Sequence, residues 1–167
     1  MTSTLPDLDA VRRDNTATVA TLRAIPDAIG LLRSAATVDP DNGEPLGIVW
    51  DFWSHHIEDD QPMMRVGLRG NLGVLRWYTA EASYAPAGTT ERDGDHEYWH
   101  GGYPQSWCEG EEIPAEYVYA AVGEFIATGQ RPTVIRWINT KDVPNLRTPA
   151  PTDESEAAEQ VWRAAAS

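Results

Sequence analysis

Three short runs of β-branched and aromatic residues, separated by turn clusters, restrict the fold of this chain more than any other feature. The runs are 46–53 (LGIVWDFW), 63–69 (MMRVGLR) and 74–79 (VLRWYT). Short runs of this composition favour strands, and the connections at 59–62 and 70–73 contain the Pro, Gly and Asn typical of turns. We therefore predict a meander of antiparallel strands in the middle of the chain.

One helix is clearly indicated after this meander. Pro114 suits the first helical turn, Gly129 suits the left-handed residue that ends a helix, and Pro132 prevents continuation. Apolar residues recur between them at helical spacing: Val118, Tyr119, Val122, Phe125 and Ile126. The pattern predicts a helix over about 114–128 that packs on the sheet, followed by a strand over 133–138.

The flanking regions complete the predicted fold. Residues 16–24 favour a strand, and residues 26–35 favour a short N-terminal helix. Between residues 84 and 110 we expect one further strand, at 96–100, and otherwise long loops. The sequence thus predicts a single α+β domain, with an antiparallel twisted sheet of about five to six strands. The main helix packs on that sheet.

The length of 167 residues fits one domain of ordinary size. We divide the chain into an N-terminal extension (1–15), an α+β domain (16–140) and a Pro-rich linker that leads to a short helix-forming segment (141–167). A single cysteine, Cys108, excludes an internal disulfide and fits a reducing compartment. The sequence contains neither an apolar run of about 18 residues nor a secretory signal pattern, so we expect a cytoplasmic protein.

The charge balance restricts the partners. The chain has 26 acidic and 13 basic residues, a formal net charge of -13. Such a surface repels nucleic acids and anionic membranes, so neither is an expected partner. The excess charge has two interpretations: it simply favours solubility, or it attracts a basic partner such as a protein that handles nucleic acid. Charge alone does not choose between them.

An H-E-x-x-H pattern is the strongest indication of an enzyme. In zinc enzymes this spacing places both His side chains on one helix face, with the Glu as general base. His96, Glu97 and His100 fit the pattern, but Tyr98 and Trp99 favour a strand, and glycines flank the segment. Two strand residues four apart lie about 13 Å from each other, too far for one metal ion. A small zinc metalloenzyme is therefore the alternative hypothesis, not the main one.

Two other groups of reactive side chains have simpler interpretations. Residues 55–60 (HHIEDD) suit a metal cluster, a pH-sensitive patch or a solvated loop, and adjacent strand residues point to opposite sides, which favours the loop. Cys108 has the chemistry of a nucleophile. Its neighbour Glu109 would not lower the pKa of the thiol, so we expect a structural cysteine. We assign no metal site and no catalytic residue.

Aromatic residues are unusually numerous outside the predicted helix. The chain has seven Trp and six Tyr but only two Phe. We predict that Trp50, Trp77 and Trp137 fill the core between sheet and helix. Aromatic residues between 84 and 107, interleaved with acidic ones, suit either the core or a protein interface, because Tyr and Trp dominate binding hot spots.

Several segments form a combined pattern: 109–116 (EGEEIPAE), 120–132 (AAVGEFIATGQRP) and 134–137 (VIRW), together with the strand pair 66–68 and 73–78. They give an acidic-Ile-Pro start, an Ala-rich helix that ends in Glu-Phe-x-x-Thr-Gly-x-x-Pro, and a strand that closes on Trp. This pattern resembles that of immunity protein family one of bacterial polymorphic toxin systems. The resemblance covers about residues 46–138.

The resemblance implies an α+β protein without catalysis or a cofactor. It implies as partner a secreted toxin domain, often a deaminase-fold enzyme acting on nucleic acid, whose substrate access the immunity protein blocks. We expect a monomer that forms a one-to-one complex with the toxin. The family's motif residues look like fold determinants: Pro114, Phe125, Gly129, Pro132 and Trp137. From acidic and aromatic chemistry we select partner-binding candidates: Asp51, Trp53, Glu58, Asp59, Tyr98, Trp99, Tyr103, Trp107 and Glu109. A general interaction protein without a toxin partner remains a third hypothesis.

Overall fold

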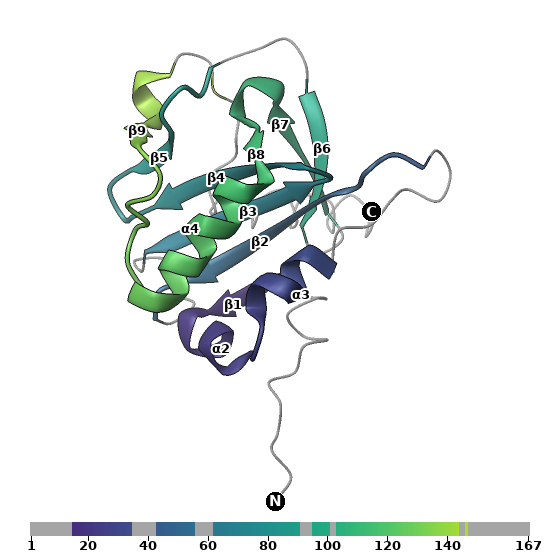
Figure 1. Cartoon of the computed structure of the whole chain (residues 1–167). Coiled ribbons are helices and arrows are strands. Elements are labelled where there is room, and N and C mark those ends of the chain that lie inside the picture. The colour runs from purple at the N-terminus through teal and green to yellow at the C-terminus, as the bar shows by residue number, and fades with distance from the viewer. Residues whose placement is uncertain are drawn as a thin grey trace, which may run out of the picture.

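A curved mixed sheet with one long helix on its face forms the structure (Figure 1). The computed structural model describes residues 15–34, 43–55, 62–90, 95–100, 103–143 and 146. The strands are β1 (Thr16–Thr18), β2 (Gly47–Trp53), β3 (Met63–Arg69), β4 (Leu72–Tyr78), β5 (Ser83–Pro86), β6 (Asp95–His100), β7 (Tyr103–Cys108), β8 (Ile113–Pro114) and β9 (Trp137–Asn139). The helices are α2 (Val19–Ala24), α3 (Ala28–Ser34) and α4 (Ala115–Thr128), with short 3-10 turns η1 (Glu109–Glu111) and η2 (Thr140–Asp142).

The predicted central meander is confirmed. Strands β2, β3 and β4 pair antiparallel, with Trp50 opposite Val66 and Val66 opposite Leu75. The connection from β3 to β4 turns at Gly70, which has a φ of 60°. This value lies in the left-handed region that favours glycine. Alternation along each strand sends one set of side chains to each face of the sheet.

The sheet is larger than predicted and is not simply antiparallel. It has nine strands within the described residues, in the order β7-β6-β2-β3-β4-β5-β9, with β1 also beside β2 and β8 beside β4. Both β1 and β6 run parallel to β2, and they share its second edge at opposite ends. Asn15 lies at this junction, where its side-chain amide donates to the carbonyl of Val49 at 2.7 Å. The edge of β2 is thereby covered instead of exposed.

The predicted main helix is confirmed as α4. It ends at Gly129, which has a φ of 68° and whose N–H donates to the carbonyl of Phe125 at 2.7 Å. Most of the predicted apolar stripe is buried, and the remaining member, Ile126, packs against the core. The short helix α3 is also confirmed, and the Asp27 carboxylate accepts from the backbone N–H of Gly30 at 2.8 Å. This bond caps the start of the helix.

The prediction of one strand over 16–24 is wrong beyond Thr18. The Thr18 hydroxyl accepts from the N–H of Thr21 at 3.3 Å and starts α2. A hydroxyl in this position satisfies one of the free N–H groups at a helix start. Helix α2 then buries Val19 and Leu22 against the core, which outweighs the strand preference of Val and Thr.

The strand predicted over 133–138 is shorter and begins later in the chain, as β9. The Glu124 carboxylate accepts from the backbone N–H groups of Thr133 at 2.8 Å and Val134 at 3.0 Å, which removes them from a strand ladder. The predicted strand at 96–100 is confirmed as β6. The long loops expected on either side of it are instead partly strands, because β5 pairs with β4 and β9, and β7 pairs with β6.

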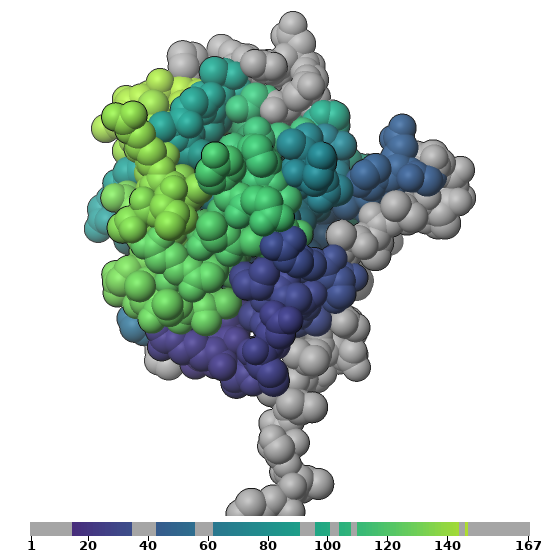
Figure 2. All heavy atoms as spheres, in the orientation of Figure 1, coloured from purple at the N-terminus to yellow at the C-terminus, as the bar shows by residue number. Residues whose placement is uncertain are grey.

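The face of the sheet under α4 carries the main apolar core. Trp50 and Trp77 are buried there, as predicted, and Trp77 contacts Phe125 edge-on, with ring centroids 6.0 Å apart. Trp137 is only partly buried and packs against the same core. Helices α2 and α3 contact α4, and in Figure 2 their atoms lie beside those of α4 on the side shown. None of the helices in the described part of the chain is long and apolar enough to cross a membrane.

Candidate partner-binding surface

The hairpin of β6 and β7 covers the sheet face opposite α4. In its register His96 lies opposite Trp107 and Tyr98 lies opposite Gln105. The rings of Tyr98 and Trp107 are fully buried and form a second small core with Val49 and Val74. This core needs a glycine in the sheet below it, because a Cβ on Gly67 would lie 2.5 Å from Val74 and 3.1 Å from the Tyr98 ring.

A row of charged side chains crosses this same face next to the second core. Asp51, Arg65 and Arg76 lie opposite one another on β2, β3 and β4. Arg65 donates to the two carboxylate oxygens of Asp51 at 2.8 and 3.1 Å, and Arg76 pairs with the buried Glu111. Two arginines directly opposite each other repel, so the two carboxylates are needed for the row to be stable.

Asp51 is the anion at one end of this row. Burial raises the pKa of its carboxyl group, but the charge and hydrogen bonds of Arg65 and the contact with His100 outweigh burial and hold the pKa below its usual value. His100 reaches Asp51 from β6, with Nε2 3.2 Å from Oδ2. The pair thus ties the hairpin to the central strands.

A second cluster of polar groups surrounds Glu112. Arg69 donates to its two oxygens at 3.0 and 2.8 Å, and the Tyr98 hydroxyl donates at 2.7 Å. Burial, together with the hydrogen bond to this carboxylate, raises the pKa of Tyr98. His96 approaches from β6, with Nε2 3.3 Å from Glu112 Oε1. Through Glu112, these contacts hold the first half of β6, with His96 and Tyr98, near Arg69 at the end of β3.

The two His residues of the H-E-x-x-H pattern therefore contact different carboxylates. The pattern forms strand β6, as the sequence predicts, and not the helix that a zinc enzyme of this type requires. His96 faces Glu112, and His100 faces Asp51. Within the described residues, no group of three or more His, Cys, Asp or Glu side chains is arranged to hold a metal ion.

The three arginine–carboxylate pairs of this region affect how the net charge is distributed over the chain. Arg65, Arg69 and Arg76 pair with Asp51, Glu111 and Glu112, three cations with three anions. These groups contribute no net charge, so the other residues carry the whole excess of -13. A basic partner that approaches the molecule would meet this excess, because these three arginines are already neutralised by carboxylates.

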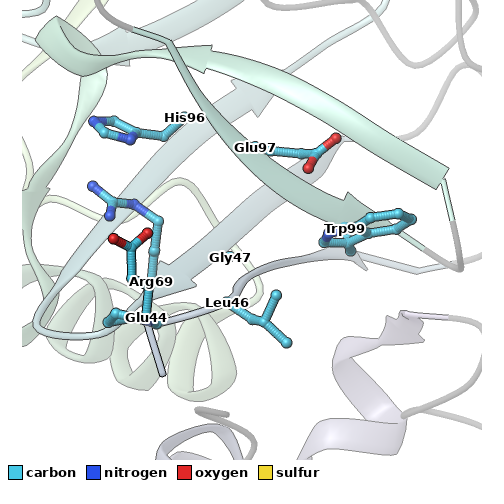
Figure 3. Close-up of a pocket in the computed structure, with 8 residues that line it drawn as sticks. Glu44, Leu46, Gly47, Arg69, His96, Glu97 and Trp99 are labelled. Carbon is cyan, nitrogen blue, oxygen red and sulfur yellow. The ribbon is translucent and has the colours of Figure 1, made fainter. Parts of the chain in front are cut away.

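A pocket of about 180 Å³ opens beside β6 (Figure 3). Its lining comes from the start of β2 and the residues before it, from the end of β3, and from β6: Glu44, Pro45, Leu46, Gly47, Arg69, His96, Glu97 and Trp99. Figure 3 shows Arg69, Glu44 and His96 at one end, and Trp99 at the other. Trp99 is 39% exposed. Among the described residues, Tyr117 and Val134 are the other large apolar side chains that are exposed, and neither of them lines this pocket.

The structure separates the predicted partner-binding residues. Asp51, Trp53, Tyr98 and Trp107 are at most 8% exposed, so little of these side chains is available to a partner. Trp99 has the opposite position, on the outer side of β6. The rest lie outside what the structure describes: Glu58 and Asp59 entirely, and the side chains of Tyr103 and Glu109, whose backbones belong to β7 and η1.

Several important residues of this region were not selected from the sequence. They are the arginines and carboxylates of the two buried clusters: Arg65, Arg69, Arg76, Glu111 and Glu112. One signal was present, because Arg65, Arg76 and Asp51 are charged residues in the middle of otherwise apolar strands. A charge at such a position is expected to have a buried partner. Which carboxylate pairs with which arginine depends on the fold.

The comparison with known proteins places the chain in a family. The family model of immunity protein Imm1 matches residues 13–139, more than half of the chain. A search among curated proteins found no match. The matched region includes every strand and every α-helix described above. The chain belongs to the Imm1 immunity protein family.

Proposed function

We propose that this protein binds a cognate bacterial toxin domain in the cytoplasm and neutralises it by covering its active site. The family match over residues 13–139 carries this proposal, because an immunity protein protects against a toxin partner. The protein itself then needs no catalytic step and no cofactor. Its protective effect depends on the shape and charge of its surface.

We further propose that the toxin is a nucleic-acid deaminase, the toxin class that the sequence resemblance implies. The net charge of -13 supports a partner of this type. An enzyme that binds phosphates presents a basic surface around its active site, and carboxylates of the immunity protein can occupy that surface in place of phosphates. Complementary fields of this kind also increase the rate of association.

For the interface we propose the outer side of β6, with Trp99 as the aromatic anchor. Trp99 is exposed and held in a strand, which limits the entropy lost on binding. The nearby predicted candidates Tyr103 and Glu109 are on or next to the hairpin, and Glu58 with Asp59 would add negative charge. The buried candidates Asp51, Tyr98 and Trp107 would act by holding the hairpin in place, not by direct contact. Trp53 is buried in a separate cluster with Met63 and Tyr78.

The experiment is co-expression of this protein with the toxin domain encoded beside its gene. We expect restored growth of the host, a one-to-one complex on size-exclusion chromatography with light scattering, and loss of deaminase activity on nucleic acid in the complex. Growth arrest despite equal expression of both proteins, with no complex formed, would refute neutralisation. A complex with a toxin of another activity would retain neutralisation and refute the deaminase assignment.

A further inference from the structure

The pocket beside β6 is too small for a typical small-molecule ligand. Its volume is about 180 Å³. Sites for drug-sized ligands usually enclose about 300 to 1,000 Å³. The space therefore suits a single side chain of a protein partner, and the residues around it decide which kind.

The wall formed by β6 combines a carboxylate with an exposed aromatic ring. Glu97 and Trp99 are two residues apart on a strand, so their side chains leave the same face. Both line the pocket, as Figure 3 shows. An indole face attracts cations, and a carboxylate beside it adds a charge-assisted hydrogen bond. This pair of groups has the chemistry of a site for a guanidinium or an ammonium group.

The cation that the pocket itself contains is already paired. The Arg69 guanidinium makes two hydrogen bonds to Glu112, at 3.0 and 2.8 Å. In Figure 3 it lies at the end of the pocket away from Trp99. With Glu44 and Glu97 also in the lining, the ionisable groups of the pocket and Glu112 sum to a negative charge. A second cation is therefore attracted to the pocket and not repelled from it.

The wall of the pocket is also held in a fixed position. Strand β6 pairs with β2 on one side and β7 on the other. Between Glu97 and Trp99 the Tyr98 side chain points inward, fully buried, and its hydroxyl donates to Glu112. A site that is rigid before binding loses less conformational entropy when the partner arrives.

We infer that this pocket binds a cationic side chain, an arginine or a lysine, of the toxin domain. The inference rests on the proposed function, because it names the chemistry of the toxin residue that enters the immunity protein. The cation stacks on the Trp99 ring and pairs with the Glu97 carboxylate. A toxin that binds nucleic acid carries such residues in its phosphate-binding surface, so occupation of the pocket removes one of them from substrate binding.

The test compares the affinity of the toxin domain for the unmodified chain and for three variants. Glu97→Gln removes the charge and keeps the size, Trp99→Ala removes the ring, and Glu81→Gln is the control, an exposed carboxylate that is not in the pocket lining. We expect Glu97→Gln and Trp99→Ala to raise the Kd about tenfold or more, and Glu81→Gln to change it less than about twofold. Unchanged thermal unfolding midpoints will show that the variants remain folded.

A double-mutant cycle then identifies the occupant. Each Arg and Lys of the toxin is replaced by Gln, and its effect on Kd is measured against the wild-type protein and against Glu97→Gln. We expect one cationic toxin residue whose replacement raises the Kd by a factor at least about fivefold smaller with Glu97→Gln than with the wild-type protein. If no cationic residue is coupled, or if Glu97→Gln and Glu81→Gln have equal Kd values, the pocket assignment is wrong while toxin binding stands. Absence of binding by the wild-type protein would instead refute the proposed function.

Discussion

The two faces of the central sheet are stabilised in different ways. The face under α4 is packed with apolar side chains such as Phe52, Val66 and Leu75. The opposite face, under the β6–β7 hairpin, combines a small aromatic core with the buried Asp51, Arg65 and Arg76 row. The same three strands supply both faces, and only the alternation of their side chains separates them.

The two faces differ in how much their stability depends on particular neighbouring side chains. Apolar packing is not directional, so a similar residue at most positions keeps most of the stability. A buried charge has a large desolvation cost that only a well-placed opposite charge offsets. The charged face therefore requires the hairpin and the segment with Glu111 in one arrangement, and that arrangement also fixes the outer surface of β6, where Trp99 is exposed.

The largest expected effect is on the charged face. Arg65→Met leaves the buried Asp51 carboxylate without its main partner. We therefore expect the free energy of unfolding to fall by about 3 to 5 kcal/mol. Urea denaturation followed by tryptophan fluorescence measures it. As a control, Arg65→Met combined with Asp51→Leu removes both charges and should recover most of the loss. A single variant within about 1 kcal/mol of wild type would contradict a tightly coupled buried pair.

On the apolar face, Leu75→Ala is the matched change one position before Arg76 on β4. It removes a side chain that is 1% exposed and leaves a cavity. We expect a loss of about 2 to 5 kcal/mol in the same urea experiment. No second substitution of a charged residue should restore the stability lost in Leu75→Ala, in contrast to the Arg65 variant. The loss in free energy of unfolding should also be the same at each pH. A strong pH dependence of that cost would show that the two faces are not independent.

A change of pH should affect the two faces differently. The pKa of Asp51 is lowered below its ordinary value of 3.8. Its pairing therefore stabilises the fold above that value and is lost as the pH falls through the lower folded-state pKa. Urea midpoints measured from about pH 6 to about pH 2 should decline less steeply for Asp51→Asn than for wild type. Parallel curves would mean that Asp51 does not contribute to acid unfolding.

The smallest expected effect is at an exposed ion pair outside both faces. Arg33 on α3 contacts Glu116 on α4 at 3.1 Å, and the two side chains are 50% and 76% exposed. Solvent screens such a pair, so Glu116→Gln should leave the thermal unfolding midpoint close to that of wild type. Differential scanning calorimetry at low and high salt tests this. A midpoint shift as large as that of Arg65→Met would show that an ion pair need not be buried to matter here.

The sequence offered candidate partner-binding residues, but it could not show which of them are exposed. The sequence analysis selected Tyr98 and Trp99 as partner-binding candidates, and the structure places both on β6, with Tyr98 buried and Trp99 exposed. The aromatic residues on the two sides of the strand could not be separated, because alternation shows that Tyr98 and Trp99 face opposite ways but not which way is inward. That depends on the strands that β6 joins.

Local patterns in the sequence determined the meander, the helix α4 with its Gly129 end, and the strand at His96–His100. Each depends on contacts and dihedral preferences within a few residues. Only the tertiary structure decided the parallel pairing of β1 and β6 with β2, the hairpin over the second face, and the partners of the three interior arginines. These contacts join segments that lie far apart in the chain. Any strand that reaches the edge of β2 can pair with it, and any carboxylate that reaches a buried arginine can neutralise it. Local sequence patterns therefore cannot identify the partner.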